Sequence, residues 1–499
     1  MSTDKFPFLT LNDKTGSAPL YQQIYESIRR AILSGEFTRG GRLPATRQLA
    51  AQLGVARMTV VNAYEQLLIE GYLEGKTGAG TYVAATLPEE MLQIARDGSP
   101  RRKTSPASQS HILSRRGKWL AAKTLTELRV QGSGDKLAFQ IGLPAVDEFP
   151  LHVWSRLAAR RLRRPPRELL SYGDPAGYRP LRASIAAHLQ STRAVQCDVE
   201  QVIIVAGSQQ ALDLTARVLL NPGDAVWVED PCYPGARNAL LAAGAQVVPV
   251  PVDGEGFDLA AGLKRRRKAR LVYVTPSHQY PLGVTMSLSR RLALLDWARQ
   301  SGALIIEDDY NSEFRYSGRP LASLQGLDKN GGVIYVGTFS KTTFPSLRLG
   351  CMVVPGDLTD AFMAARALID RHSPSIDQAI LTDFIEEGHF ARHIRRMRSL
   401  YAERQAQLIA AAASELAGLL EVKPAAAGMH LIGWLPKGVS DNDASEQAAR
   451  HRVEAAPLSA YSSKSLARGG LILGYTAVNP RQIKDGARRL ARALRRRAG

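Results

Sequence analysis

The sequence predicts a multidomain protein in which a small α+β domain is followed by a large α/β domain built on a mostly parallel sheet. Three features predict this fold class. Residues 1–83 show helical periodicity and then a glycine-rich hairpin pattern, residues 84–135 show no clear periodicity, and in residues 136–499 short apolar runs alternate with helical stretches. A chain of 499 residues is long enough for this arrangement and for at least one large core.

The composition is that of a globular protein. Hydrophobic residues make up 45% of the chain and charged residues 22%. There is no run of about 18 apolar residues, and residues 1–5 lack a signal-peptide pattern. Cys197, Cys232 and Cys351 have neither disulfide nor metal-site spacing. We therefore expect a cytoplasmic protein with reduced thiols, no membrane span and no bound metal.

The net charge of +19 favours a polyanionic partner such as double-stranded DNA. The surplus does not lie mainly in the first domain, where nine Lys and Arg oppose seven Asp and Glu. It lies in the linker and in residues 160–167, 264–268 and 488–497. We expect each of these runs to be solvated surface, although together they could help to hold long or bent DNA.

Residues 1–83 predict three helices. Apolar residues recur at helical spacing in residues 19–34, and Gly35 marks the end of that helix. Thr46 is placed to cap a short second helix, and Gly54 makes the turn after it. A third helix over residues 57–69 buries one stripe of side chains, namely Val60, Ala63, Tyr64, Leu67 and Leu68.

The third helix carries candidate DNA contacts. Its other face presents Arg57, Thr59 and Asn62 near the N-terminal end, which is the end of a recognition helix that meets the major groove. Residues 71–83 alternate around a glycine-rich turn and predict a two-stranded wing, on which Lys76 is a further candidate. These features together predict a winged helix-turn-helix.

Four strings in this domain closely resemble the GntR winged-helix family: LPATR at 43–47, LGVAR at 53–57, EGY at 70–72 and GAGTYV at 78–83. The resemblance implies that Arg47 and Arg57 contact DNA and that the wing touches the minor groove. Either arginine can serve a phosphate or a guanine edge. A small domain with a purely structural role would not account for all four strings.

Residues 84–135 predict a basic, flexible linker. No acidic residue occurs between residues 98 and 126, and proline, serine and like charges disfavour a packed core. The segment is predicted to tether the two domains and is able to touch DNA phosphates. Residues 119–122, Trp-Leu-Ala-Ala, are candidates for docking on the next domain.

Five short apolar runs predict strands of the large domain: residues 202–205, 225–228, 271–274, 303–306 and 333–336. Helical segments separate most of them, which is typical of a mostly parallel sheet with helices on both faces. Ligand sites in such sheets lie beyond the carboxyl ends of the strands. We therefore expect the functional residues directly after these runs.

Chemically distinctive residues do follow the runs. Small residues at 206–212, with Ser208 and Gln209 at a helix start, can cradle a phosphate. Tyr233, after the second run, offers a ring that can stack on a flat cofactor. Asp308, after the fourth run, can hold a pyridine nitrogen protonated, which makes that ring an electron sink.

The fifth run is followed by Gly-Thr-Phe-Ser-Lys at residues 337–341. The amine of Lys341 can form an imine with an aldehyde cofactor. Seven residues further on, Arg348 can add a fixed positive charge for a phosphate. Each residue has an ordinary structural explanation alone, but their joint order predicts a cofactor site.

The large domain resembles fold-type I aminotransferases, and over essentially its full length the chain resembles the MocR/GabR regulators, as residues 275–283 and 307–314 indicate. The resemblance implies pyridoxal 5'-phosphate (PLP) as cofactor, Lys341 as the Schiff-base lysine and Asp308 as the partner of the pyridine nitrogen. It implies six further contacts: Tyr310 on the ring hydroxyl, Tyr233 stacked on the ring, and Ser208, Gln209, Ser340 and Arg348 on the phosphate.

The same resemblance implies the organisation of the large domain and its assembly. Within the aminotransferase-like domain at 136–499, we expect a large part at about 170–375 and a small part at about 376–499, which the segment before the large part joins. We also expect a head-to-tail homodimer, in which each DNA-binding domain lies against the partner's PLP domain.

Two departures from the aminotransferase pattern are expected to matter. Residues 280–283, Tyr-Pro-Leu-Gly, replace the usual Asn-Pro before the glycine, which leaves His278 or Gln279 as the substitute contact to the ring hydroxyl. Ile472 stands where aminotransferases carry the arginine that binds the substrate carboxylate. Arg468 is close in sequence and is the candidate substitute for substrate binding.

The sequence therefore predicts a PLP-dependent, DNA-binding transcriptional regulator that senses an amine, an amino acid or PLP itself through a Schiff-base site. The alternative is a catalytically active aminotransferase with a DNA-binding appendage, because the groups for that chemistry are present. Transaminase activity is left open but is not predicted to be the main role. The missing carboxylate arginine mildly favours PLP over an amino acid as the signal.

Overall fold

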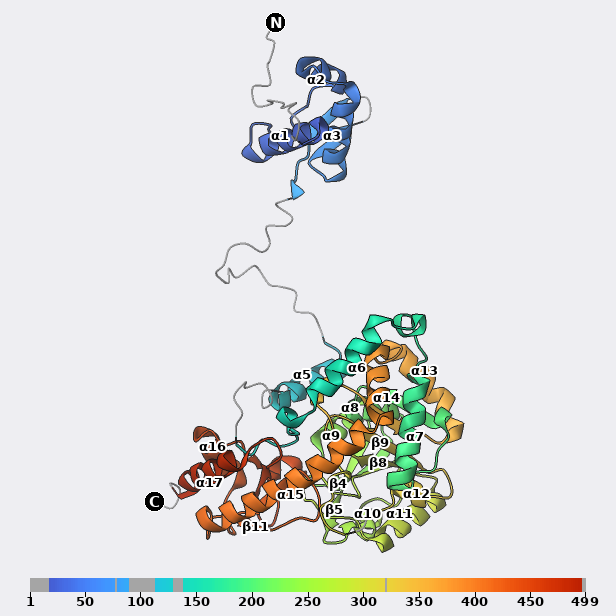
Figure 1. The fold of residues 1–499 in the computed structure, drawn as a ribbon, viewed down its shortest axis with the longest axis vertical. Helices are drawn as coiled ribbons and strands as arrows, with labels where there is room; N and C mark the ends of the chain where they lie inside the picture. Colours follow the sequence, from blue (N-terminus) through green and yellow to red (C-terminus); the bar gives the residue numbers. More distant parts are fainter. Residues whose placement is uncertain (1–17, 77–78, 89–112, 129–137, 319–320, 496–499) are drawn as a thin grey trace. The chain divides into compact units, whose positions relative to one another are not determined.

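The computed structural model describes residues 18–76, 79–88, 113–128, 138–318 and 321–495. The chain divides into two compact units, Met1–Ile112 and Leu113–Gly499 (Figure 1). Much of the predicted linker lies outside the described residues. Its residues 115–128 form a helix, α5 (Arg115–Leu128), which the sequence did not predict and which belongs to the second unit.

The first unit has three helices and an antiparallel hairpin, as the sequence predicts. They are α1 (Leu20–Ser34), α2 (Thr46–Leu53), α3 (Arg57–Ile69), β1 (Leu73–Lys76) and β2 (Gly80–Val83). Their apolar stripes meet in one core that includes Ile24, Val60 and Leu67. α1 ends at Gly35, whose φ of +83° is a left-handed conformation that glycine adopts without strain.

Two details of this unit correct the sequence prediction. Ala45, not Thr46, is the N-cap of α2, and Thr46 is the first helical residue with no capping side-chain hydrogen bond. Leu68 is 36% exposed, because it lies about 100° around α3 from the buried Leu67.

An eight-stranded sheet forms the centre of the second unit. Its strands, in spatial order, are β3 (Val202–Val205), β10 (Gly350–Val353), β9 (Val333–Thr338), β8 (Leu304–Asp309), β7 (Leu271–Val274), β4 (Ala225–Asp230), β5 (Gln246–Asp253) and β6 (Gly256–Phe257). The predicted runs correspond to β3, β4, β7, β8 and β9, of which the last four are parallel. The sequence missed β10, which is antiparallel to both neighbours, and the proline-containing β5.

Helices cover both faces of this sheet. On one face lie α8 (Ser208–Leu219), α9 (Pro234–Ala242) and α13 (Thr359–Asp370); on the other lie α11 (Leu288–Ser301) and α12 (Leu324–Leu327). Val226 and Val228 pack on the first face and Trp227 on the second, which is the two-residue period of a strand. With both faces covered by apolar contacts, the polar residues gather at the strand ends.

A second, four-stranded sheet lies in the C-terminal part of the unit. Its order is β11 (Glu421–Val422), β12 (His430–Trp434), β14 (Gly470–Gly474) and β13 (Ala456–Pro457). It shares a core with Phe139 and Ala145 and with the helices α15 (His389–Glu415), α16 (Asp441–Arg450) and α17 (Pro480–Arg495). Further helices are α6 (Leu151–Arg163), α7 (Arg179–Arg193), α10 (Leu259–Arg265) and α14 (Ser375–Glu386). Among the described helices, none is long and apolar enough to cross a membrane.

Candidate functional site

Four predicted cofactor residues come together at the carboxyl edge of the large sheet. Lys341 follows β9, Asp308 lies at the end of β8, and Ser208 begins α8 shortly after β3. Ser208 Oγ donates a hydrogen bond to Asp308 Oδ1 at 3.5 Å. Asp308 and Arg348 are both close enough to act electrostatically on the Lys341 amine.

Asp308 is a buried carboxylate suited to face a cation. It is 4% exposed, and Tyr273 OH on β7 donates to its Oδ2 at 2.9 Å. Burial raises the pKa of Asp308 to about 6, while the hydrogen bonds from Tyr273 and Ser208 and the charge of Lys341 lower it. Tyr273 was not among the predicted site residues, although its hydroxyl is unusual in an otherwise aliphatic strand.

The side chain of Lys341 is half-buried, and its amine lies against the segment that precedes the large sheet. Its Nζ donates to Gly142 O at 2.7 Å, and a Cβ on Gly142 would lie 3.3 Å from that nitrogen. Burial lowers the pKa of Lys341 to about 8, an effect that Asp308 opposes and Arg348 reinforces. At pH 7 about a tenth of the amine is then neutral and nucleophilic, far more than for an exposed lysine.

Residues predicted to hold the phosphate surround the start of α8. Gly207, with φ +108°, precedes this helix, and Arg348 Nη2 lies 3.4 Å from where a Cβ on Gly207 would be. Ser340 Oγ is buried and has no hydrogen-bond partner among the described residues. Gln209 is exposed in the first turn of the helix. The helix start, a guanidinium and a free hydroxyl make an anion cradle.

Aromatic rings line the rest of the site. Tyr280 makes edge contacts with Tyr233, Tyr310, Tyr461 and His430, with ring centroids 5.6–5.8 Å apart. The OH of Tyr310 is buried and has no partner in the described part of the chain. Tyr233 and Tyr310 were predicted from the sequence, whereas the other three rings were not, because nothing local in the sequence marks them.

The two candidate substitutes for the missing asparagine have different roles. Gln279 Nε2 already donates hydrogen bonds to Glu229 Oε2, Pro231 O and Tyr280 O. These bonds within the protein use the donors of its amide, so none is left for a cofactor. His278 is buried, and its Nε2 has no partner within the described residues. Burial lowers the pKa of His278 to about 3, so its ring is neutral at pH 7. Of the two, His278 has the capacity for a contact to a ligand.

The structure does not bring Arg468 to this site, contrary to our expectation. Its guanidinium donates to Leu435 O at 2.6 Å, to Glu421 Oε2 at 2.8 Å and to Trp434 O at 3.4 Å. Trp434 ends β12 and His430 begins it, so Arg468 is held roughly 13 Å along the strand from the site. Closeness to Ile472 in sequence did not become closeness in space.

Ile472 is fully buried in an apolar wall. It packs with Leu458 and Ile432, and Leu282 and Tyr461 pack against this cluster. The position at which the resemblance to aminotransferases predicts a carboxylate-binding arginine is therefore occupied by an apolar side chain.

The residues present fit PLP. Three buried polar atoms without partners in the described ranges, Tyr310 OH, Ser340 Oγ and His278 Nε2, belong to residues predicted to touch the ring hydroxyl or the phosphate. Leaving such atoms unsatisfied is costly unless a ligand pairs with them. PLP bound at Lys341 would supply an electron sink for a ligand's amine, with Asp308 beside the pyridine nitrogen.

The candidate DNA contacts lie on the surface of the first unit. Arg47, Arg57, Asn62 and Lys76 are exposed, and Thr59 is half-buried. Lys76 Nζ lies 4.9 Å from the centroid of a tyrosine ring on β2. These polar and basic side chains on α2, the start of α3 and the wing are therefore accessible, as DNA contacts of a winged helix-turn-helix must be.

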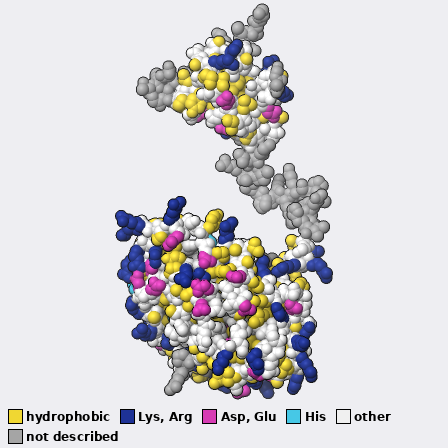
Figure 2. All heavy atoms as spheres, turned by 90° about the vertical axis from the view of Figure 1, so that its right-hand side faces the viewer, with side chains coloured by type: hydrophobic (Ala, Val, Ile, Leu, Met, Phe, Trp, Pro, Cys, Tyr) yellow, Lys and Arg dark blue, Asp and Glu magenta, His cyan; other side chains and the backbone are white. Residues whose placement is uncertain are grey.

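Basic runs of the second unit are mostly solvated. Residues 264–268 are all exposed, whereas Arg160 and Arg161 are paired with Asp383. On the face shown in Figure 2, Lys and Arg side chains of this unit are spread out, with Asp and Glu side chains among them. This face offers no single basic patch.

Comparisons with known proteins assign both units to families. Residues 20–83 match the bacterial regulatory proteins of the gntR family, and residues 135–468, more than half of the chain, match aminotransferase class I and II. The probable rhizopine catabolism regulatory protein MocR of Rhizobium meliloti is 41% identical over 97% of this chain and 95% of its own length. The chain belongs to the MocR-type regulators.

Two solved structures similar to this MocR-type chain are aminotransferases. Multiple substrate aminotransferase from Thermococcus profundus matches with a TM-score of 0.71 and 31% identity, over 77% of this chain and 98% of that one. α-Aminoadipate aminotransferase LysN from Thermus thermophilus, complexed with N-(5'-phosphopyridoxyl)-L-leucine, matches with a TM-score of 0.68 and 32% identity over the same shares. The second unit has this fold, and its cofactor is PLP.

Proposed function

We propose that this protein is a transcriptional regulator in which a small amine, an amino acid or PLP itself, bound at Lys341, changes DNA binding by the winged domain. One observation carries the proposal: three predicted cofactor residues have buried polar atoms without partners among the described residues, in a chain whose winged domain also exposes Arg57 and Asn62 on α3. Such a ligand shifts the equilibrium between two states only by its differential affinity for them.

The wall around Ile472 supports an amine over an α-amino acid as the ligand at Lys341. A buried carboxylate needs a cation or hydrogen-bond donors, whereas this wall offers aliphatic carbon. An amine with an apolar substituent can displace the lysine and bury that substituent against the wall.

We further propose that two copies of the chain assemble head to tail. The second unit exposes three large side chains, Leu170, Tyr172 and Leu368. Leu368 lies near the first turn of α8, because Gln210 of that turn donates a hydrogen bond to Asp370. Leu368 is 88% exposed and Tyr172 is 79% exposed, which is unusual for large side chains unless a partner covers them.

The test is the affinity for promoter DNA of the protein with PLP bound, measured by fluorescence anisotropy with matched ligands. Isobutylamine is compared with L-valine, and phenethylamine with L-phenylalanine, since each amine is the amino acid without its carboxylate. We expect the amines to change DNA affinity at least as strongly as the amino acids, and Lys341→Ala to abolish the response.

Arg57→Ala provides the matched control. It should weaken DNA binding while leaving the absorption spectrum of bound PLP unchanged. The proposal fails if neither PLP nor any of these ligands alters DNA affinity.

A working aminotransferase is the second candidate, favoured by the retention of Lys341 beside Asp308 and Tyr310. Steady formation of a keto acid from an amino acid and a second keto substrate would support it. A single spectral change without turnover would count against it.

A further inference from the structure

A third segment pairs with the wing that β1 and β2 form in the first unit. Arg42 lies opposite Tyr82 of β2 in an isolated antiparallel β-bridge, and Leu43 N donates to Thr81 O at 2.9 Å. Leu43 and Val83 are buried in the core of this unit, so the segment before α2 is fixed against the wing. The sequence predicted a two-stranded wing and missed this pairing, because a single bridge leaves no alternating pattern.

Arg42 lies on the outer face of this small sheet. Residues directly opposite one another on paired strands share a face, and so do residues two apart along one strand. The face of Arg42 therefore also carries Tyr82, Gly80 and Lys76, whereas Val83 points into the core. Arg42 and Lys76 are both exposed, so two basic side chains of the wing are accessible.

The guanidinium of Arg42 lies directly on the backbone of Gly80. A Cβ on Gly80 would be 3.0 Å from Nε and 3.3 Å from Nη2 of Arg42, so a side chain at residue 80 would meet the guanidinium. Gly80 also has a φ of +112°, which favours glycine. Because the arginine side chain already rests on the wing, it loses less conformational freedom when it binds a partner.

No acidic side chain neutralises Arg42 within the described part of the chain. No carboxylate there lies within 4.0 Å of its guanidinium. Glu74 lies on the same face of the wing and is exposed, but it makes no ion pair with Arg42. The positive charge is therefore available to a polyanion.

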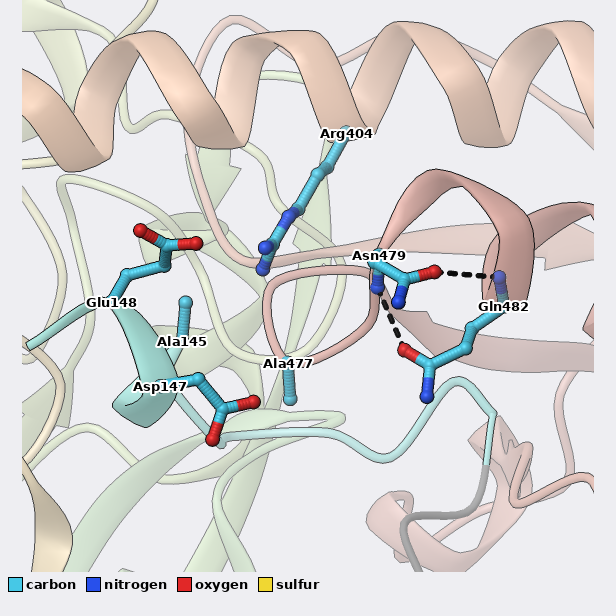
Figure 3. A pocket seen from close by; sticks show the side chains of 7 residues that line it. All are labelled: Ala145, Asp147, Glu148, Arg404, Ala477, Asn479 and Gln482. Carbon is cyan, nitrogen blue, oxygen red and sulfur yellow. Dashed lines mark hydrogen bonds between the residues drawn. The ribbon is translucent and has the colours of Figure 1, made fainter.

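Polar atoms around a cavity in the second unit differ in this respect. The cavity, of about 220 Å³, lies between the 3-10 turn Val146–Glu148, α15 and the start of α17 (Figure 3). Asn479 N donates to Gln482 Oε1 and Gln482 N donates to Asn479 Oδ1, both at 2.9 Å (Figure 3), and Arg404 Nη1 donates to Thr476 O. Atoms bonded in this way need no ligand, whereas the guanidinium on the wing has no such partner among the described residues.

We propose that Arg42 enters the minor groove of bound DNA beside the wing and favours A·T base pairs there. A narrow, A·T-rich minor groove has an enhanced negative potential that attracts arginine. Its base edges present only acceptors, which match the donors of a guanidinium, whereas G·C pairs add the N2 amine of guanine. The inference rests on DNA binding by the winged domain, and it requires no ligand at Lys341.

The experiment uses the full chain with PLP bound and a duplex that it selects from a random DNA library. Affinity is measured by fluorescence anisotropy at one fixed salt concentration. Arg42→Gln should weaken binding at least fivefold, because it removes both a charge and base-edge donors. Arg30→Gln, which removes the same charge from an exposed position on α1, should change the affinity less than twofold. Equal affinities of the two variants overturn the proposal.

A second measurement identifies the groove. Replacing adenine by 2,6-diaminopurine adds an amine to the minor groove and leaves the major-groove edge unchanged. The wild-type protein should bind this duplex at least fivefold more weakly, and the loss should be at least threefold smaller for Arg42→Gln. An equal loss for both proteins overturns the assignment of Arg42 to the minor groove.

Failure of this inference can be told apart from failure of the proposed function. A wild-type protein that selects no duplex from the library contradicts both. A wild-type protein that binds its duplex while Arg42→Gln binds as tightly as Arg30→Gln contradicts only the role of Arg42.

Discussion

The two ends of the Lys341 site differ in how many of the functional residues expected of an aminotransferase they contain. At the cofactor end, Lys341, Asp308 and Tyr310 are assembled, with buried polar atoms available to a ligand. At the far end, Ile472 is buried among apolar side chains, and Arg468 is tied to Glu421 and two backbone carbonyls. Cofactor binding and recognition of an α-carboxylate are therefore separable, and among the described side chains around Ile472 none is a cation for a carboxylate.

The largest expected effect is that of replacing Lys341 at the cofactor end of the site. Lys341→Ala should abolish covalent attachment of PLP, because no other amine is placed to replace Nζ among the described groups around Asp308. The measurement is the visible absorption band after PLP addition, with borohydride trapping followed by mass spectrometry. Apo-protein DNA affinity should change less than twofold, and a folded variant that loses all DNA binding would contradict the separation of the two functions.

Asp308→Asn, at the same end of the site, should have a smaller effect, which is a loss of affinity for PLP. Removing the charge beside the pyridine nitrogen costs a charge-assisted hydrogen bond of about 1.5–3 kcal/mol, or roughly 10- to 100-fold in PLP affinity. Fluorescence titration with PLP measures this loss. Asp296→Asn, an exposed position on α11, is the control and should leave the affinity unchanged.

The pH dependence of PLP uptake tests the burial of Lys341. Only the neutral amine reacts, and burial lowers the pKa of Lys341 to about 8. The rate of covalent attachment to apo-protein should rise about tenfold per pH unit below pH 7 and level off above about 8. A rate that keeps rising to pH 10 would mean that the amine is solvated.

The smallest expected effect concerns the far end. Arg468→Ala should change the affinities for PLP and for the responsive ligand by less than twofold, because its guanidinium is held on β11 and β12 away from the site. Its ion pair with the solvent-exposed Glu421 contributes little to stability, because water screens it. If this variant selectively loses affinity for amino acids over amines, Arg468 does reach the ligand.

What the sequence predicted is what is local in the chain. Apolar runs mark β4, β7, β8 and β9, and the residues just after them are brought together at one edge of a parallel sheet. The groups that contact these residues and set their chemistry lie far from them along the chain. Tyr273 is 35 positions from Asp308, and Gly142 is 199 positions from Lys341, so no local pattern could show them.

Contacts between residues far apart in the chain also explain where the structure differs from the sequence-based predictions. β5 was missed because its two prolines suggest a loop, although parallel pairing with β4 holds it as a strand. Arg468 was predicted to bind substrate because it is close to Ile472 in sequence. The extended chain of the second sheet instead holds it away from the Lys341 site. His278 and Gln279 could be told apart only by counting their partners in space.

The most direct test of the central claim is the visible absorption spectrum of the purified protein as PLP is added, followed by titration with the amine and amino-acid pairs. We predict a band that depends on Lys341 and that shifts with amines at least as readily as with the matching amino acids. No band after PLP addition would contradict the cofactor site, and a band that shifts only with amino acids would contradict the difference between its two ends.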